Sequence, residues 1–277
     1  MINYNNHNIT AITYDNHSIK YVYGCGGNLV WSGNTTPPTP HDYSKDALGF
    51  VAKEDVFFTF HFALTPTQLY FSTNNGSTWT QLDNVNVDRT PVIHAGEKIM
   101  WKGQLTPSTA SQDYGIGRFI SYNGNNDNYK GRFDVEGNVM SLLFGDNFSG
   151  ETSLDGYNEA FLNLFSGLTE LESAENMILP ATTLSYRCYG QMFRACVSLT
   201  TAPTLPATVL AERCYASMFN DCSSLNKITC LAEDISAPNC TVLWVSDVAS
   251  TGTFIKSPNM QSWTTGDDGI PSGWTIQ

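Results

Sequence analysis

The C-terminal half of the chain repeats itself with a period of 26 residues. The segment Leu179–Leu184 recurs as Leu205–Leu210, and a block that begins at Cys188-Tyr189 begins again at Cys214-Tyr215. A fixed period of this length is typical of an architecture that stacks one small unit on the next. The repeat therefore constrains the fold more than any other feature. Further pairs in the same register are Met192-Phe193 with Met218-Phe219, Cys196 with Cys222, and Ser198-Leu199 with Ser224-Leu225.

About three repeat units are present. Leu164-Phe165 precedes Met192-Phe193 by 28 residues, which implies a two-residue insertion. Cys240 occupies the position in its unit that Cys214 occupies in the preceding one. Three units are close to the minimum for a stable stack, because each unit buries its apolar face only against its neighbours.

Apolar side chains within a unit recur at the spacing of a helix. Cys214, Met218 and Cys222 lie at i, i+4 and i+8, which predicts one inward face of an α-helix. Thr182 and Thr208 are the expected N-caps, because a threonine hydroxyl accepts the free N–H groups at a helix start.

A short strand accompanies each predicted helix. Leu199–Ala202 and the equivalent Leu225–Ile228 suit strands of three or four residues. One strand and one helix in each unit of 26 residues predict a leucine-rich-repeat solenoid.

The cysteines are expected to be buried free thiols. Of seven, six lie in the last third of the chain, at intervals that do not form the close pairs of a zinc site. Equivalent positions on stacked helices are about 8 to 10 Å apart, beyond the roughly 7 Å limit for a disulfide. We therefore predict no metal site and no cofactor. The six are Cys188, Cys196, Cys214, Cys222, Cys230 and Cys240.

The repeat block as it stands at Cys188–Thr208 resembles the BspA-like leucine-rich repeats of Bacteroides-type gut bacteria and of their crAss-like phages. The chain end resembles the terminal cap of that family, and the preceding residues resemble its lead-in. The resemblance covers about residues 131–277. The cap motif is Thr251–Lys256, Trp263 and Gly269–Thr275, and the lead-in is Phe133–Asn138 with Gly145–Phe148.

This resemblance implies surface recognition and assembly rather than catalysis. Bacterial members usually carry an export signal, whereas Met1–Asn8 has neither a basic segment nor an apolar one. We therefore expect a bacteriophage virion protein, a head- or tail-fibre or other appendage subunit, assembled in the host cytoplasm. Its expected partners are other virion proteins, further copies of itself in a trimer, and a glycan or protein of the host surface. The alternative is a cell-surface adhesin of the bacteria themselves.

The N-terminal half reads as β-structure. Short strands are expected within Ile9–Trp31, which resembles the start of phage fibre proteins, and the proline-rich Thr35–Pro40 predicts an extended linker. Phe58, Phe60 and Phe62 alternate as on one face of a strand, and Asn74-Asn75-Gly76 predicts a hairpin turn. Further strands are expected at Gln68–Ser72, Thr78–Leu82, Pro91–Ala95, Lys98–Lys102, Ile116–Ser121 and Arg132–Val135.

The patterns together predict a multidomain α+β protein. Its N-terminal all-β hairpins and β-sandwich precede the leucine-rich-repeat solenoid with its terminal cap. The expected divisions are a β docking segment at residues 1–33, a linker at 34–41, a β-sandwich at 42–138 and the repeat domain at 139–277.

Charge and hydropathy exclude two kinds of partner. The formal net charge is −12, from 26 acidic against 14 basic residues, so a phosphate backbone is repelled and nucleic-acid binding is not expected. No stretch approaches the roughly 20 apolar residues of a membrane-spanning helix, so no membrane insertion is expected.

The sequence contains none of the common catalytic motifs, and an enzyme is not predicted. A glycan-acting enzyme remains a third hypothesis, because the 26 carboxylates allow acid pairs. Asp83–Asp88 and Asn123–Asn128 resemble calcium loops, but they lack the fixed glycine and distal glutamate, which favours solvated turns. His61 and His94 are expected to be packed or hydrogen-bonded rather than catalytic. The candidate ligand-binding residues are three aromatics that would stack on sugar rings, Trp79, Tyr122 and Tyr129.

Overall fold

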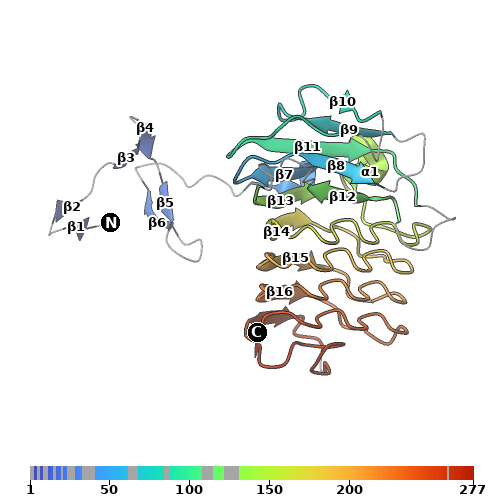
Figure 1. The fold of residues 1–277 in the computed structure, drawn as a ribbon. Helices are drawn as coiled ribbons and strands as arrows, with labels where there is room; N and C mark the ends of the chain where they lie inside the picture. Colours follow the sequence, from blue (N-terminus) through green and yellow to red (C-terminus); the bar gives the residue numbers. More distant parts are fainter. Residues whose placement is uncertain are drawn as a thin grey trace. The chain divides into compact units, whose positions relative to one another are not determined.

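The computed structural model describes residues 41–61, 68–83, 88–107, 115–121, 131–260 and 262–277, together with the backbone of six short strands before residue 33. The chain divides into two compact units, Met1–Asp42 and Tyr43–Gln277 (Figure 1).

The first unit contains three antiparallel strand pairs. They are β1 (Asn3–Tyr4) with β2 (His7–Asn8), β3 (Ile12–Tyr14) with β4 (His17–Ile19), and β5 (Tyr21–Tyr23) with β6 (Leu29–Ser32). The short strands expected within residues 9–31 are thus confirmed. Most of the expected linker lies outside the described residues.

The second unit is built on one mixed sheet of ten strands, in the order β10-β9-β11-β7-β13-β14-β15-β16-β17-β18. The pairs from β10 to β13 are antiparallel, and those from β13 to β18 are parallel (Figure 1). The strands are β7 (Leu48–Ala52), β9 (Leu69–Ser72), β10 (Thr80–Gln81), β11 (Lys98–Gly103), β13 (Phe133–Asn138), β14 (Leu171–Ile178), β15 (Thr201–Leu205), β16 (Lys227–Cys230), β17 (Thr253–Lys256) and β18 (Thr275–Ile276).

The predicted fold class is wrong. The protein is mostly β, and its described part contains a single α-helix of four residues, α1 (Ser141–Phe144). The β-sandwich and the leucine-rich-repeat solenoid were expected as separate folds, but β13 pairs with β7 on one side and with β14 on the other. Both regions therefore belong to one sheet. Thr182 and Thr208 cap no helix, because none follows them.

The segments expected as helices are runs of turns. Arg187, Gln191 and Ala195 have φ of 51°, 54° and 59°, so every fourth residue is left-handed, which an α-helix of L-residues excludes. The N–H of Gly190 donates to the carbonyl of Arg187 (3.0 Å), and that of Arg194 donates to Gln191 (3.1 Å). Each such bond closes one turn.

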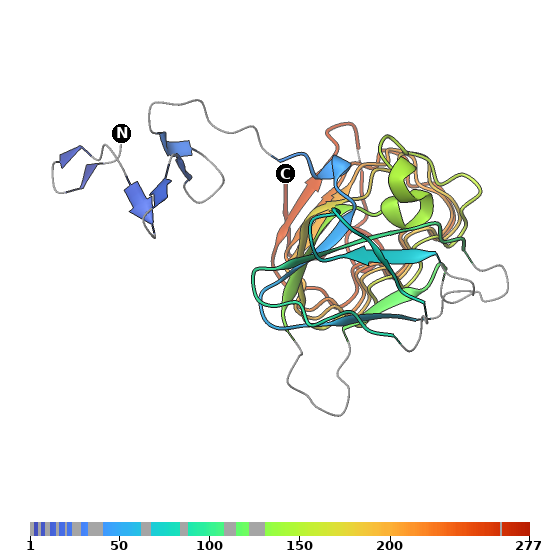
Figure 2. The ribbon, with the colours of Figure 1, turned by 90° about the horizontal axis from the view of Figure 1, so that it is seen from above.

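The N–H groups between these turns pair with the following segment of the chain. Tyr189 donates to the carbonyl of Cys214 (3.0 Å), and Phe193 donates to that of Met218 (2.9 Å). Backbone groups that a helix would satisfy internally are therefore shared between adjacent layers. Seen from above, the yellow to red segments lie one behind another (Figure 2).

Aromatic rings form two stacks inside these layers. The ring centroids of Phe165 and Phe193 are 5.3 Å apart, and those of Phe193 and Phe219 are 5.6 Å apart. Tyr189 stacks on Tyr215 at 6.1 Å. The Tyr215 hydroxyl is buried and has no hydrogen-bond partner among the described residues, so Tyr215 contributes as an apolar ring.

The chain end covers the last layer. Trp263 stacks on Trp244 with centroids 5.7 Å apart, and the Trp244 indole N–H donates to the carbonyl of Gly269 (2.7 Å). Because a large apolar ring is buried there with its one polar group satisfied, residues after 250 protect the end of the core.

A second group of aromatics fills the antiparallel end. β8 (Phe58–His61) and β12 (Arg118–Ser121) form a two-stranded sheet of their own. Phe58 and Phe119 from this pair approach Phe50 of β7, with ring centroids 4.7 and 4.8 Å apart. The strand expected at Phe58 and Phe60 is confirmed and both rings are buried, but Thr59 between them is buried as well, so burial does not alternate there; Phe62 lies outside the described residues.

The six cysteines of the repeats are free and buried, as predicted. The Cys196 thiol donates to the carbonyl of Phe165 (3.1 Å), and the Cys222 thiol donates to that of Phe193 (2.9 Å). Burial raises the pKa of Cys188 to about 12, so its unreactive thiol form prevails at neutral pH.

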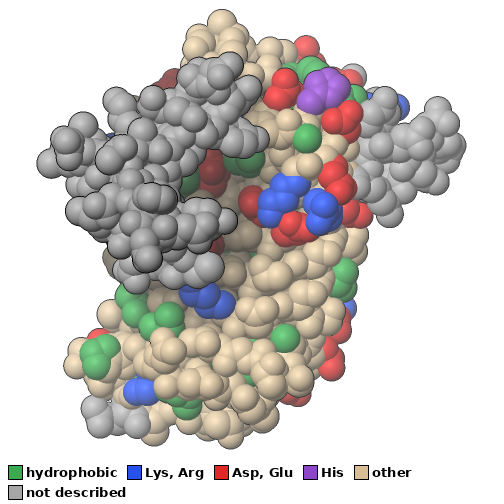
Figure 3. Space-filling view, turned by 90° about the vertical axis from the view of Figure 1, so that its left-hand side faces the viewer, with side chains coloured by type: hydrophobic (Ala, Val, Ile, Leu, Met, Phe, Trp, Pro, Cys, Tyr) green, Lys and Arg blue, Asp and Glu red, His purple; other side chains and the backbone are tan. Residues whose placement is uncertain are grey.

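Ion pairs join the antiparallel and parallel parts of the sheet. Lys53 lies 2.8 Å from both Asp134 and Glu172, and Arg132 lies 2.9 Å from Glu172 and 2.8 Å from Glu54. The hydrogen bond from Lys53, with a further contribution from Arg132, lowers the pKa of Glu172. Basic and acidic side chains gather together on the face drawn in Figure 3.

Candidate functional site

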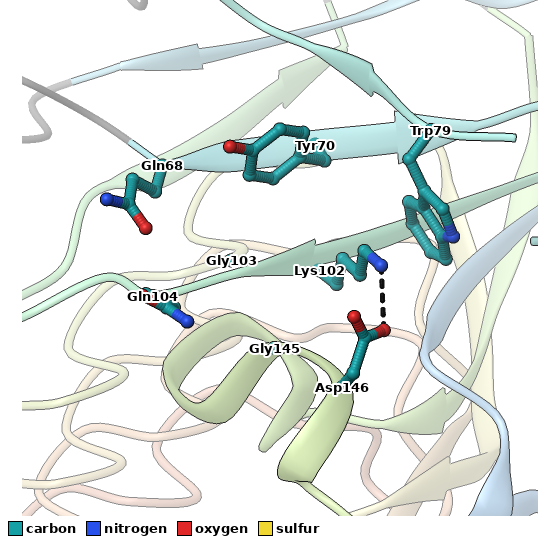
Figure 4. Close-up of a pocket in the computed structure, with 8 residues that line it drawn as sticks. All are labelled: Gln68, Tyr70, Trp79, Lys102, Gly103, Gln104, Gly145 and Asp146. Atoms are coloured by element: carbon teal, nitrogen blue, oxygen red, sulfur yellow. Dashed lines mark hydrogen bonds and ion pairs between the residues drawn. The ribbon is translucent and has the colours of Figure 1, made fainter.

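An open pocket of about 300 Å³ lies at the antiparallel end of the sheet (Figure 4). Residues of β9, β11 and the turn after α1 contribute to it, together with a tryptophan that precedes β10. The lining residues are Gln68, Tyr70, Trp79, Lys102, Gly103, Gln104, Gly145 and Asp146.

The sheet register brings two of these side chains together. Lys102 of β11 lies opposite Tyr70 of β9 in the antiparallel ladder, so both side chains project from the same face. A hairpin with left-handed Asn75 and Gly76 (φ 54° and 78°) returns the chain from β9, which confirms the predicted turn and places Trp79 at the pocket.

Two glycines shape the pocket where other residues would clash or be strained. A Cβ on Gly103 would lie 2.7 Å from the carbonyl oxygen of Gln68, so only glycine allows β11 to approach so closely. Gly145 has φ 55° and ψ −127°, a conformation that side chains disfavour, and it turns the chain so that Asp146 follows at the pocket.

The two charged side chains of the described lining form a pair. The Lys102 ammonium lies 2.7 Å from a carboxylate oxygen of Asp146, and it also lies 4.4 Å from the ring centroid of Trp79. The lysine side chain is 16% exposed, whereas that of Asp146 is 81% exposed. Asp146 is therefore open to a ligand while the lysine is held by the ring and the carboxylate.

Three neutral polar groups complete the pocket. Among the described residues, the side-chain amides of Gln68 and Gln104 and the hydroxyl of Tyr70 make no hydrogen bond. Figure 4 shows the two amides at one end of the pocket and Trp79 at the other. Such a lining, apolar rings with a few converging polar groups, is typical of sites that orient a small polar ligand.

The sequence identified one residue of this pocket in advance. Trp79 lines it, and its role in stacking on sugars stays a prediction; Tyr122 and Tyr129 lie outside the described residues. Sequence reasoning missed Tyr70, Lys102 and the other lining residues. The available signal was the alternation within the two expected strands. It assigns Tyr70 and Lys102 each to one face of its own strand, but it does not show that the two strands are neighbours.

His61 and His94 do not line this pocket. His94 approaches Asp55 at 3.1 Å on the surface, and it follows an isolated bridge between Val56 and Ile93 where a strand was expected at Pro91–Ala95. Desolvation and the charge of Arg118 lower the pKa of His61.

No cluster of three metal-ligating side chains occurs in the described part of the chain. Most of the first calcium-like loop and all of the second lie outside that part. No helix among the described residues has the length and apolar character needed to cross a membrane.

Comparisons with protein-family models, with curated proteins and with solved structures found no match to this chain.

Proposed function

We propose that this protein is a structural subunit of a bacteriophage virion, a head- or tail-fibre or other appendage, that recognises a host surface. The observation that carries the proposal is the open pocket on the large unit, whose neutral polar groups have no hydrogen-bond partner among the described residues. A small separate unit of strand pairs precedes it, which suits a division between attachment and recognition. The resemblance of Cys188–Thr208 to repeats of Bacteroides-type bacteria and their phages supplies the biological setting.

The pocket chemistry favours binding over hydrolysis. Glycosidases usually place two carboxyl groups about 5 to 9.5 Å apart across the bond that they cleave. Among the described residues, the lining has one carboxylate, Asp146, which is already paired with Lys102. We therefore propose recognition without turnover.

The proposed assembly is a homotrimer attached to other virion proteins through residues 1–33. Fibre-like subunits of the family that the repeats resemble suggest this symmetry. Native mass measurement of the full chain tests it: the mass of three chains supports the assembly, and a monomer at micromolar concentration contradicts it.

Localisation on particles is the test of the function itself. Particles of the encoding phage are purified, analysed by peptide mass spectrometry and labelled with an antibody against residues 43–277 for electron microscopy. We expect the chain at a fixed stoichiometry and the label on a projecting appendage. Purified particles that lack the chain contradict the proposal, and surface labelling of bacterial cells instead identifies an adhesin.

A further inference from the structure

We infer that the pocket binds an uncharged sugar residue of a surface glycan through two adjacent hydroxyl groups. The inference rests on the proposed recognition function and names the ligand class for the same site.

The charge pair selects the kind of group that is bound. The Lys102 ammonium only donates hydrogen bonds and the Asp146 carboxylate only accepts them, and the two lie 2.7 Å apart. Two neighbouring hydroxyls match this arrangement, because one donates to the carboxylate while the other accepts from the ammonium. A lone anion would be repelled by Asp146 and by the net charge of −12, and a lone cation would compete with Lys102.

The aromatic lining suits the apolar face of a sugar ring. Tyr70 lies opposite Lys102 in the sheet and is half-buried, so part of its side chain stays accessible to a ligand. The ring face of Trp79 that meets the lysine is covered by the ammonium at 4.4 Å. Figure 4 shows Tyr70 above the space between Gln104 and Lys102. We therefore assign the stacking platform to Tyr70, and Trp79 to holding the lysine.

The amides at the far end provide further hydrogen bonds. Gln68 and Gln104 each offer one donor group and one acceptor, and neither has a partner among the described residues. Hydroxyl and acetamido groups can both donate to the amide oxygen and accept from the amide N–H groups, whereas a ring oxygen can only accept. The volume of about 300 Å³ is at the lower limit for small-molecule pockets, which favours one sugar residue over a longer chain.

The test uses the full chain on an array of neutral and acidic oligosaccharides, followed by saturation-transfer NMR with methyl glycosides of the sugars that bind. The Asp146→Asn variant removes the charge of an exposed side chain while keeping its shape. Asp155→Asn is the matched control, because Asp155 is also exposed and does not line the pocket. We expect neutral glycans to bind, Asp146→Asn to weaken binding about tenfold or more, and Asp155→Asn to leave it unchanged.

Three results overturn the inference: binding of acidic glycans alone, binding that Asp146→Asn does not weaken, or no glycan bound at millimolar methyl glycoside. An unfolding midpoint of Asp146→Asn equal to that of the unsubstituted chain shows that lost binding is not lost folding. The proposed function fails separately. A chain found on particles without glycan binding overturns only the sugar site, and glycan binding by a chain absent from particles overturns only the virion role.

Discussion

Replacing Ala195 with glycine is expected to stabilise this protein. Ala195 has φ 59°, and its N–H donates to the carbonyl of Asn220 at 2.8 Å, so the next layer fixes its left-handed conformation. That conformation costs an L-residue roughly 1–2 kcal/mol, which glycine avoids. Glycine in turn loses about 0.5–1 kcal/mol more conformational free energy on folding. The difference predicts a net stabilisation of about 0.5–1 kcal/mol.

The reverse substitution is available in the preceding layer. Gly167 occupies the equivalent position, with φ 78° and its N–H donating to the carbonyl of Arg194 at 2.8 Å. A Cβ added at Gly167 meets no atom within 4 Å, so Gly167→Ala changes backbone preference without a steric clash. We expect this variant to be destabilised by about 0.5–1 kcal/mol.

Ala216→Gly is the matched control, because Ala216 lies in the same kind of turn without a positive φ. Glycine at position 216 relieves no backbone strain. It increases the conformational entropy that is lost on folding, and it removes a buried methyl group. We therefore expect Ala216→Gly to destabilise the chain, opposite in sign to Ala195→Gly.

Equilibrium urea unfolding followed by circular dichroism measures these differences, and thermal unfolding should shift by about 2–4 °C for each kcal/mol. The denaturant slope is expected to stay constant, so that the midpoint reports stability alone. Glycine costs about 1 kcal/mol inside an α-helix. A midpoint lowered by Ala195→Gly, as by Ala216→Gly, would therefore refute the turn geometry and restore the helical interpretation.

Three further outcomes test the core and the ion pairs. Lys53 lowers the pKa of Glu172, so the stability that the ionised carboxylate contributes is complete above the ordinary pKa of 4.5 and is lost as the pH falls. In the Glu172→Gln variant, the urea unfolding midpoint should therefore depend less on pH between about pH 5 and pH 3. A pH dependence equal to that of the unsubstituted chain contradicts this. Tyr215→Phe removes a buried hydroxyl that has no hydrogen-bond partner among the described residues. The free energy of unfolding in urea should stay unchanged or rise by up to about 1 kcal/mol. A decrease of about 2 kcal/mol would show that the hydroxyl does form a hydrogen bond. In a Cys25→Ser background, Cys188 and the other repeat thiols should resist a chromogenic disulfide reagent at pH 8 until urea is added, and rapid labelling of the folded chain contradicts their burial.

Local chemistry was sufficient to predict several features of this fold. The turn at Asn74-Asn75-Gly76 requires two left-handed residues, and asparagine and glycine adopt that conformation most readily. The burial of the repeat cysteines followed from their place in an apolar pattern, which is independent of the secondary structure that carries it. The strand that contains Phe58 and Phe60 was predicted from an equally local pattern.

The pocket depended on pairings that no local pattern reveals. Tyr70 and Lys102 meet because β9 and β11 pair in one register, and a shift of one residue would send one of the two side chains to the opposite face. Asp146 arrives from the turn after α1, a segment that was noted only for its resemblance to a lead-in. Predicting the site therefore requires the order of the strands in the sheet, which no local sequence pattern gives.

The error in fold class arose because a run of four-residue turns and a helix share nearly the same apolar pattern. Cys188, Met192 and Cys196 follow a period of four, and over eight residues a helix of period 3.6 drifts from that period by only about 80°. An apolar helix face is itself about 100° wide, so the three residues fit one face of either structure. Two turns are too short to separate the two periods.

The residues between the apolar positions carry the distinction. In the four successive layers one left-handed position is occupied by Gly167, Ala195, Asp221 and Asp247. Glycine and aspartate are poor residues for a helix interior but are among those that adopt positive φ most readily. An alignment of the layers on their apolar positions would have shown these four equivalent residues as one column. Ala195 is the one member of the column that does not readily adopt positive φ. The same column that separates turns from helix thus also identifies the substitution that stabilises the protein.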